Sequence, residues 1–235
     1  MTHRHRSMFV VAAMILLPAL AFAQAEPEKS RAVAGGGVSV KGWMGKVDAK
    51  EATSGMTIDN AKLASEGKDL HVTTGPASVF WNPANTASGD YTVKATFTEP
   101  KYMSINSHPH PYGIVIGGND MGTDKQSYLY CAAYGNGSFI VRGFGPDAFA
   151  MNGGRGASDP AVNKAAGVGQ PVTQEIAMSV KGGSVSCSIN GKVVATYDKA
   201  ALVAPGKLKS TDGVYGIRFA HNTDGSVSGL AMTKP

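Results

Sequence analysis

The stretch QSYLYCAAYGNGSFIVRGF, residues 126–144, carries the clearest structural signal in the chain. Two runs of alternating side chains flank a tight Gly-Asn-Gly sequence at 135–137. Short alternating runs on either side of such a turn are typical of a β-hairpin. We therefore predict antiparallel strands at 126–134 and 138–143.

The turn also predicts how the two strands pair. It sets Cys131 opposite Val141 on one face of the hairpin and Tyr130 opposite Arg142 on the other. The first face is small and apolar, so we expect it in the core, with the aromatic and cationic face outside. A shift of one residue would reverse this assignment.

The rest of the chain repeats this pattern. Glycine accounts for 30 of 235 residues, and 43% of the residues are hydrophobic against 17% charged. Many turns between short alternating runs favour an all-β fold. We predict a single domain at 38–235, a two-sheet antiparallel sandwich of the jelly-roll type. The expected strands are 38–47, 56–64, 69–73, 77–81, 90–98, 112–118, 126–134, 138–143, 172–180, 184–190, 192–197, 213–220 and 225–232, with a helical turn at 199–203.

The N-terminus is typical of a secretory signal peptide at residues 1–23. Two arginines precede an apolar run of 15 residues at 8–22, and Ala-Phe-Ala follows at its end. The run is too short for a membrane span. We expect a secreted or periplasmic protein, no membrane insertion after cleavage, and a flexible lead-in at 24–37.

Cys131 and Cys187 are the only cysteines. Each lies on the apolar side of an alternating segment. Export permits a disulfide, but two buried thiols that pack as small apolar groups fit the pattern as well. The sequence leaves both possibilities open.

Charge and motifs exclude several functions. The formal net charge is +5 and falls to +3 without residues 1–23, which is too mild to predict a nucleic-acid partner. The sequence has no nucleophile elbow, zinc-protease motif, phosphate loop or dinucleotide fingerprint. No strand carries the paired carboxylates of a jelly-roll glucanase, which disfavours an ordinary two-carboxylate glycosidase.

The outer face of the hairpin is the candidate binding surface. Aromatic rings stack on sugar C–H faces, and arginine binds two oxygens at once, with a further gain for anionic sugars. Aromatic cross-strand pairs and surface arginines are the structural alternative. The candidate ligand-binding residues are Tyr112, Tyr128, Tyr130, Arg142 and Arg218, with Tyr112 and His110 at the rim.

Two segments can be considered for a divalent metal, either a transition metal or calcium. Proline holds the segment His108-Pro-His110-Pro extended, and His221 can join its two imidazoles. The turn at 119–124 places Asp120 and Asp124 around a glycine, as loops that bind calcium do. The alternatives are a stiff loop whose histidines face water and a simple Asp-rich turn.

The order of four segments resembles the concanavalin A-like jelly rolls. GIVIGG at 113–118 precedes the Tyr-rich hairpin, and SVSCSINGKVVATYD at 184–198 and TDGVYGIRFAHNTDGSVSGLAM at 211–232 follow it. Within that group the chain is most similar, over 41–233, to exported bacterial domains of the 3-keto-disaccharide hydrolase type. The resemblance implies two curved sheets with Tyr130, Arg142 and Arg218 on a concave, sugar-facing surface. Enzymes of this type can depend on a divalent metal.

These observations predict an exported protein that binds a glycan on a concave sheet face. The alternative is a metal-assisted hydrolase or lyase acting on 3-keto-glycosides, with His108, His110 or His221 as ligand or base and its catalytic residues otherwise unknown. A third possibility is a protein-interaction module. In that case the long Gly-rich loop at 144–171 is the candidate contact.

Overall fold

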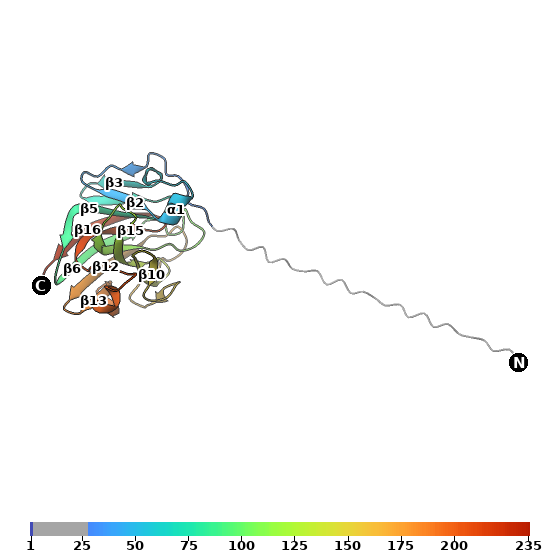
Figure 1. Cartoon of the computed structure of the whole chain (residues 1–235). Coiled ribbons are helices and arrows are strands. Elements are labelled where there is room, and N and C mark those ends of the chain that lie inside the picture. The colour runs from blue at the N-terminus through green and yellow to red at the C-terminus, as the bar shows by residue number, and fades with distance from the viewer. Residues whose placement is uncertain (2–27) are drawn as a thin grey trace.

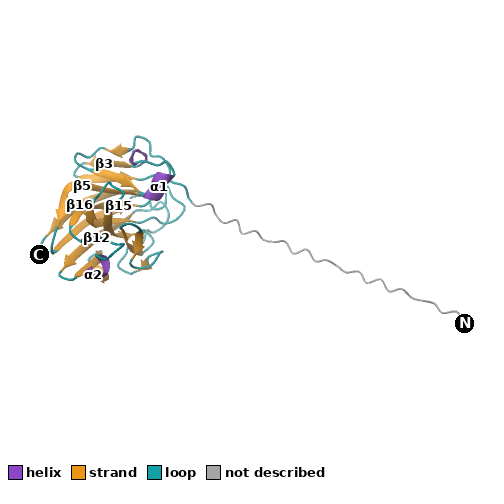
Figure 2. Ribbon diagram, viewed as in Figure 1, coloured by secondary structure: helices purple, strands orange, loops and turns teal. Residues whose placement is uncertain are grey.

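Two β-sheets lie face to face and form a sandwich (Figures 1 and 2). The computed structural model describes Met1 and residues 28–235. The predicted signal peptide at 1–23 and the start of the lead-in at 24–27 therefore lie outside the described residues, apart from Met1. Strands dominate the ribbon, and the short helices lie at its periphery (Figure 2). The predicted all-β sandwich is confirmed.

The first layer, here called the β6 sheet, has eight strands in the order β1-β3-β4-β16-β6-β12-β13-β14. Only β1 and β3 pair in parallel. The strands are β1 (Gly37–Val38), β3 (Lys62–Glu66), β4 (Asp69–Thr73), β16 (Asp224–Thr233), β6 (Tyr91–Glu99), β12 (Val172–Lys181), β13 (Ser184–Ile189) and β14 (Lys192–Asp198).

The second layer, the β8 sheet, has the order β10-β9-β8-β7-β15-β5-β2, and β11 pairs with β9. Its strands are β10 (Ala148–Ala150), β9 (Ser138–Phe144), β8 (Ser127–Ala133), β7 (Tyr112–Asn119), β15 (Gly213–Phe219), β5 (Ser78–Ala87), β2 (Met44–Val47) and β11 (Ala157–Ser158). The helices are α1 (Ala49–Thr53), the 3-10 turn η1 (Ile58–Asn60) and α2 (Lys199–Leu202).

Most predicted strands match these bounds, with four differences. The predicted strand 38–47 is two separate strands, and η1 occupies much of 56–64. The strand that begins at Ser78 continues past Pro83 to Ala87. The predicted loop 144–171 contains β10 and β11, because both pair with the edge of β9.

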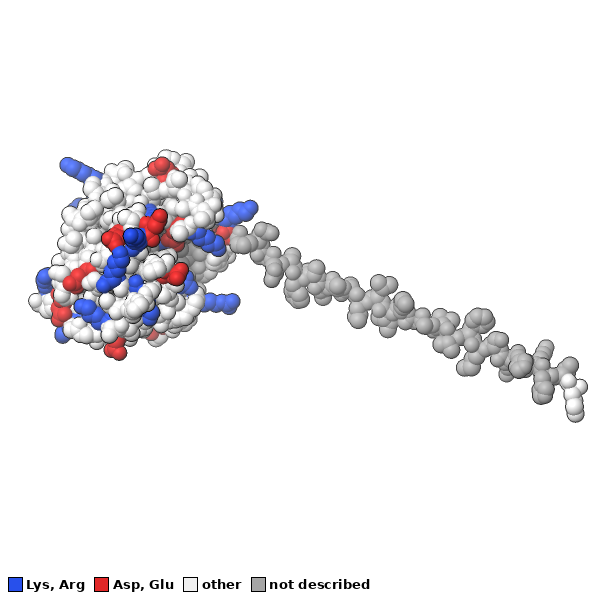
Figure 3. Space-filling model, in the orientation of Figure 1, with Lys and Arg blue, Asp and Glu red and all other residues white. Residues whose placement is uncertain are grey.

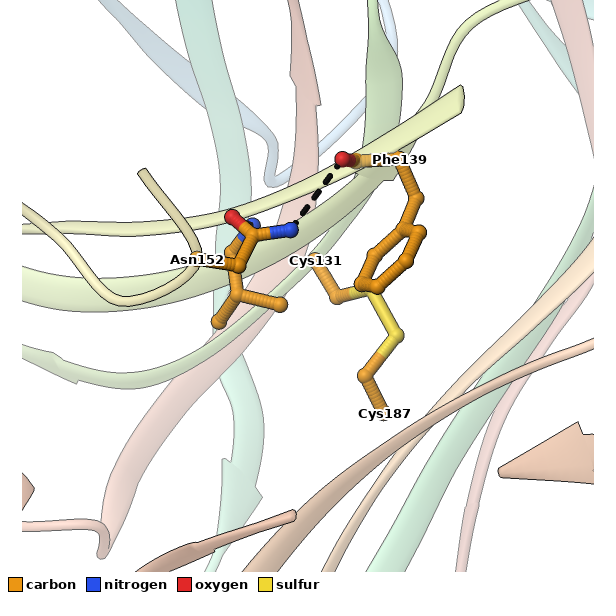
Figure 4. The surroundings of a disulfide bond; sticks show 5 residues. Cys131, Phe139, Asn152 and Cys187 are labelled. Carbon is orange, nitrogen blue, oxygen red and sulfur yellow. Dashed lines mark hydrogen bonds between the residues drawn. A yellow bond between two sulfur atoms is a disulfide. The ribbon is translucent and has the colours of Figure 1, made fainter. Parts of the chain in front are cut away.

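The predicted hairpin register is confirmed. Cys131 pairs with Val141 and Tyr130 with Arg142. The cysteine face lies in the core between the sheets. There Cys131 forms a disulfide with Cys187, with 6.2 Å between the Cα atoms, and links β8 to β13 across the sandwich (Figure 4).

The side chain of Asn152 makes two hydrogen bonds to the backbone of β9 near this bridge. Its amide donates to the carbonyl of Phe139 at 3.2 Å, beside the disulfide (Figure 4). Its Oδ1 accepts from the backbone N–H of Val141 at 2.8 Å. The loop after β9 is thus tied to the strand that it leaves.

The opposite face of the β8 sheet points away from the core, as predicted, but it is not open to water. Tyr128, Tyr130 and Arg218 are 0%, 5% and 7% exposed. Together with Val79, Trp81, Val115, Ala132 and Ile140, the two tyrosines form a second apolar cluster. The prediction of a solvent-exposed aromatic face is therefore wrong, because segments from distant parts of the sequence cover most of it.

Tyr112 does not belong to this outer face. It is 1% exposed and packs between the sheets, where its ring stacks on Phe97 and Phe219. The register explains this position, because Tyr112 pairs with the inward-facing Phe219 of β15. The placement of Tyr112 at the rim of a binding surface is wrong.

The described part of the lead-in packs against the fold. The backbone N–H of Arg31 donates to Asn222 at 3.0 Å, and the Asn222 amide donates to the Lys29 carbonyl at 3.0 Å. Further along, Gly37 and Val38 pair with β3. The expectation of a flexible segment therefore does not hold from residue 28 on. Within the described residues, no helix is long and apolar enough to cross a membrane.

Candidate functional site

A pocket of about 400 Å³ remains open on the covered face of the β8 sheet. Its lining combines tyrosine rings with arginine side chains and ends at a group of histidines. The pocket is formed by Tyr130, Tyr134, Arg142, Arg155 and Arg218, and by His108, His110 and His221 with adjoining backbone. The predicted residues Tyr130, Arg142 and Arg218 thus meet in one place.

Arg218 forms the inner wall of the pocket. Its guanidinium makes two hydrogen bonds to the Asp48 carboxylate, at 2.7 and 2.5 Å, and donates to the Tyr128 hydroxyl at 3.0 Å. It also lies 5.0 Å from the ring centroids of both Tyr130 and Phe144. Burial alone would lower the pKa of Arg218, but the Asp48 charge, the hydroxyl groups of Tyr128 and Tyr130 and the hydrogen bonds to Asp48 together outweigh burial and raise it. Arg218 is therefore a buried, paired cation and not a surface arginine.

Arg142 and Arg155 are differently placed. Arg142 projects from β9 beside Tyr130 and donates to the Gly154 carbonyl. Its Nε atom is buried and has no hydrogen-bond partner among the described residues. Arg155 is exposed. Neither arginine pairs with a carboxylate within residues 28–235, so both leave positive charge at the pocket. On the face of the molecule shown in Figure 3, basic and acidic side chains are intermixed.

The three histidines come together through the pairing of β7 with β15. His110 lies just before β7 and His221 just after β15, and these strand ends are adjacent because Tyr112 pairs with Phe219. The Nε2 atom of His110 lies 3.0 Å from that of His108 and 2.9 Å from that of His221. The sequence prediction that these three residues share one site therefore agrees with their placement.

The Nδ1 atom of each of the three rings lies near an oxygen atom. His110 Nδ1 lies 2.5 Å from the His221 carbonyl oxygen. His221 Nδ1 is 3.3 Å from Ser30 Oγ, and His108 Nδ1 is 3.5 Å from Glu28 Oε2. Burial, followed by the charges of the other two histidines, lowers the pKa of His110 to about 4. Burial likewise lowers the pKa of His221. Both rings are therefore neutral at neutral pH, the form in which imidazole binds metals.

Glu28 anchors the segment that covers the histidines. Its carboxylate accepts from the backbone and hydroxyl of Ser107, at 2.7 and 2.6 Å, and from the Asn222 amide at 2.9 Å. Burial opposes ionisation, but these hydrogen bonds prevail and lower the pKa of Glu28 to about 2. The carboxylate is thus charged and held beside His108.

A second cavity of about 680 Å³ lies on the other side of the histidines. Glu28, Glu51 and Met56 contribute to its lining, and it shares His108 and His221 with the arginine pocket. The histidines therefore lie where the two openings meet. A ligand in either one can reach them.

The other predicted site residues are not part of this arrangement. Tyr128 has no exposed surface and supports Arg218 through its hydroxyl. Asp120 pairs with Lys209, and Asp124 pairs with Lys46 at 3.3 Å on the surface. Within residues 28–235, the group with metal-ligand spacing is the histidine trio, not the Asp-rich turn.

Sequence reasoning missed the residues that complete the site. Asp48 precedes a five-residue helix, and Glu28 and Ser30 lie in a segment that the composition marks as a polar leader. No local pattern distinguishes them from surface residues. Their role depends on contacts across 170 positions for Asp48 and 191 for Ser30.

No family model matches the sequence, and no curated protein matches it either. Solved structures are similar in fold. A carbohydrate-binding module, CBM66 from Bacillus subtilis, superposes with a TM-score of 0.55 at 8% identity and covers 84% of this chain and 99% of that one. A Bacillus subtilis protein of unknown function with a galectin-like fold gives a TM-score of 0.56 at 14% identity, over 83% and 90% of the two chains. At these identities the likeness establishes a galectin-like jelly-roll fold and nothing about the ligand.

Proposed function

We propose that this chain is an exported glycan-recognising protein that binds carbohydrate in the arginine pocket. The observation that carries the proposal is the convergence of Tyr130, Arg142 and Arg155 on one opening beside the buried Arg218–Asp48 pair. Aromatic rings and fork-shaped donors are the groups that recognise sugars. A carbohydrate-binding module among the similar structures agrees with this function.

The charge of the pocket favours an acidic sugar. The Asp48 carboxylate neutralises Arg218, whereas Arg142 and Arg155 have no acidic partner among residues 28–235. A carboxylate or sulfate on the glycan would complete bidentate pairs with either guanidinium. Among glycans of equal size, acidic ones should therefore bind more tightly than neutral ones.

A glycan array tests this function. The purified chain from Gln24 on is applied with and without chelator, and neutral and acidic glycans are compared at low and high salt. The proposal predicts selective retention of acidic glycans that weakens as salt rises, because exposed charges are screened. Binding to no glycan under either condition would contradict it.

The histidine trio supports a second candidate function, cleavage of 3-keto-glycosides. His108, His110 and His221 would hold a divalent metal at the end of the sugar pocket. A metal bound there would polarise a sugar carbonyl as a Lewis acid. Incubation of a 3-keto-glycoside with metal-loaded protein should release sugar, and the His108→Ala variant should not. No turnover by either protein would exclude this activity, and equal turnover by both would exclude the histidine trio as its metal site.

The protein-interaction alternative gains no comparable support. Among residues 28–235, the exposed large apolar side chains are Met44, Val168 and Val193. They belong to β2, a loop and β14, which are separate parts of the fold. A docking surface for a protein usually presents a contiguous apolar patch.

A further inference from the structure

We propose that His108, His110 and His221 form a transition-metal site of the zinc class, completed by the N-terminal segment 28–30. The proposal concerns the metal itself and does not depend on whether the neighbouring pocket binds a glycan. The six ring nitrogens and the groups around them have the arrangement of such a site.

The ring nitrogens of the three histidines lie close together. The Nε2 atom of His110 lies 3.0 Å from that of His108 and 2.9 Å from that of His221, and one ligand atom from each residue lies within 4.8 Å of the others. Three nitrogens around a tetrahedral zinc, each about 2.0–2.1 Å from the ion, are separated by about 3.3 Å. The cluster therefore needs only small side-chain movements to hold such an ion, and the exposed His108 can provide them.

The Nδ1 atoms all face oxygen, which sets the tautomers. The carbonyl of His221 can only accept, so His110 carries its proton on Nδ1 and its Nε2 presents a lone pair. His108 Nδ1 faces Glu28, and His221 Nδ1 faces Ser30 and lies 3.9 Å from Glu51. A carboxylate or carbonyl behind a ligating imidazole is the usual outer shell of a metal centre. With their Nδ1 protons directed at these oxygens, the three Nε2 lone pairs are free to bind a cation.

Neighbouring residues hold both of the segments that carry the histidines. Pro109 and Pro111 hold the His108–His110 segment extended. His221 lies two residues after the end of β15, and Asn222 next to it is buried, adopts a φ of 46° and bonds to Glu28 and Lys29. A site held in this way loses little conformational freedom when it binds an ion.

The donor set selects the metal. Three imidazoles favour zinc, and also cobalt, nickel and copper, over calcium and magnesium, which take oxygen ligands. Cys131 and Cys187 are bonded to each other and offer no thiolate. Three protein ligands leave at least one coordination position for water or another ligand, as in zinc sites that act on bound molecules. Two cavities share His108 and His221, so a molecule bound in either one lies beside the cluster.

The test is a metal titration without any glycan. The chain from Gln24 on is stripped with chelator, and Zn²⁺ binding is measured by calorimetry and Co²⁺ binding by its visible spectrum. We expect one ion per chain and a tetrahedral-type cobalt spectrum. The matched control is His71→Ala, because His71 also pairs with carboxylates but lies on β4, outside the cluster.

Variants of the ligands decide the outcome. His108→Ala removes an exposed side chain and should fold normally, whereas His110 is buried, so His110→Gln is compared with it. Both should weaken Zn²⁺ binding by more than the roughly 10–100-fold expected when an outer-shell partner is lost, as in Glu28→Gln. His71→Ala should bind as the wild type does.

Two results would overturn the proposal. One is a wild-type chain that takes up neither Zn²⁺ nor Co²⁺, which would leave the trio as hydrogen-bonded imidazoles. The other is equal affinity in the wild type and His108→Ala. Because no sugar is present in the titration, neither result bears on glycan binding, and a negative glycan array does not bear on the metal.

Discussion

The buried charge of Arg218 is balanced by one carboxylate, that of Asp48. The pair that it forms with Asp48 is mostly buried, with side chains 8% and 20% exposed. Removing one partner of such a pair leaves an uncompensated charge in an apolar setting, which costs more than the pair itself contributes. The wall of the proposed binding pocket is therefore held by a contact that the fold cannot easily replace.

Asp48→Asn should destabilise the protein by about 3 kcal/mol, measured as the free energy of unfolding in urea. Asp48 makes no capping hydrogen bond to α1, so the helix itself should not suffer. The control is Asp124→Asn, which breaks the surface pair with Lys46 and should cost less than about 1 kcal/mol. Equal losses in the two variants would contradict the assignment.

Glu99 is a second residue with an unusual setting. Its Oε1 accepts from the backbone of Met103 at 3.2 Å, and its Oε2 is buried without a partner among the described residues. Burial raises its pKa to about 7, with a further contribution from the charge of Asp224. Tyr102 and Tyr112 face the same carboxyl group. The folded chain therefore keeps Glu99 protonated where the unfolded chain releases the proton.

This difference predicts a pH-dependent stability. The contribution of Glu99 is fully present below pH 4.5, the ordinary value, and is lost as the pH rises through about 7. On the order of 2–3 kcal/mol of unfolding free energy should disappear between pH 4.5 and 8. Glu99→Gln should lack this component when the two proteins are compared in urea at both pH values. An unchanged difference between them across this range would disprove it.

At the scale of elements, the disulfide joins the two layers. Cys131 of β8 and Cys187 of β13 are separated by 56 positions in sequence. In the chain-entropy model a bridge across a loop of that length stabilises by about 4 kcal/mol. The Cys131→Ala, Cys187→Ala double variant should lose about that much, as measured by chemical unfolding. Reductant should destabilise the wild type and leave the double variant unchanged, and insensitivity of the wild type would refute the bridge.

Elements with regular alternation could be predicted, and irregular ones could not. The strand β4 matches its predicted bounds, because period-2 patterning depends on local sequence alone. In contrast, β10 lies in a Gly- and Pro-rich segment and forms only because it pairs with β9. Phe149 packs over Gly143 there, at a position where a Cβ would meet the ring at 2.1 Å. That fit depends on how the two strands pair and leaves no alternating pattern in the sequence of β10.

At the scale of the whole molecule, the site was predicted in part. The histidines were expected together, and the pairing of β7 with β15 brings them together. The prediction for Tyr112 is wrong, although its sequence position indicates the core. Tyr112 alternates with Ile114 and Ile116, which both face inward. The burial of Arg218 could not be foreseen, since its partner Asp48 lies 170 positions away in the sequence.

Glycan binding in the arginine pocket can be measured directly. The test is the calorimetric affinity of the best array ligand for the wild type and three variants. Arg142→Ala and Arg155→Ala alter the pocket, and Arg155 is exposed, so its loss should not affect folding. Lys94→Ala removes an exposed cation from the outer face of the β6 sheet and serves as the control.

Both arginine variants should lower the affinity at least tenfold, since a bond to a charged group contributes about 1.5–3 kcal/mol, while Lys94→Ala binds as the wild type does. Wild-type affinity in both arginine variants, or a loss confined to Lys94→Ala, would place the ligand elsewhere and contradict the account.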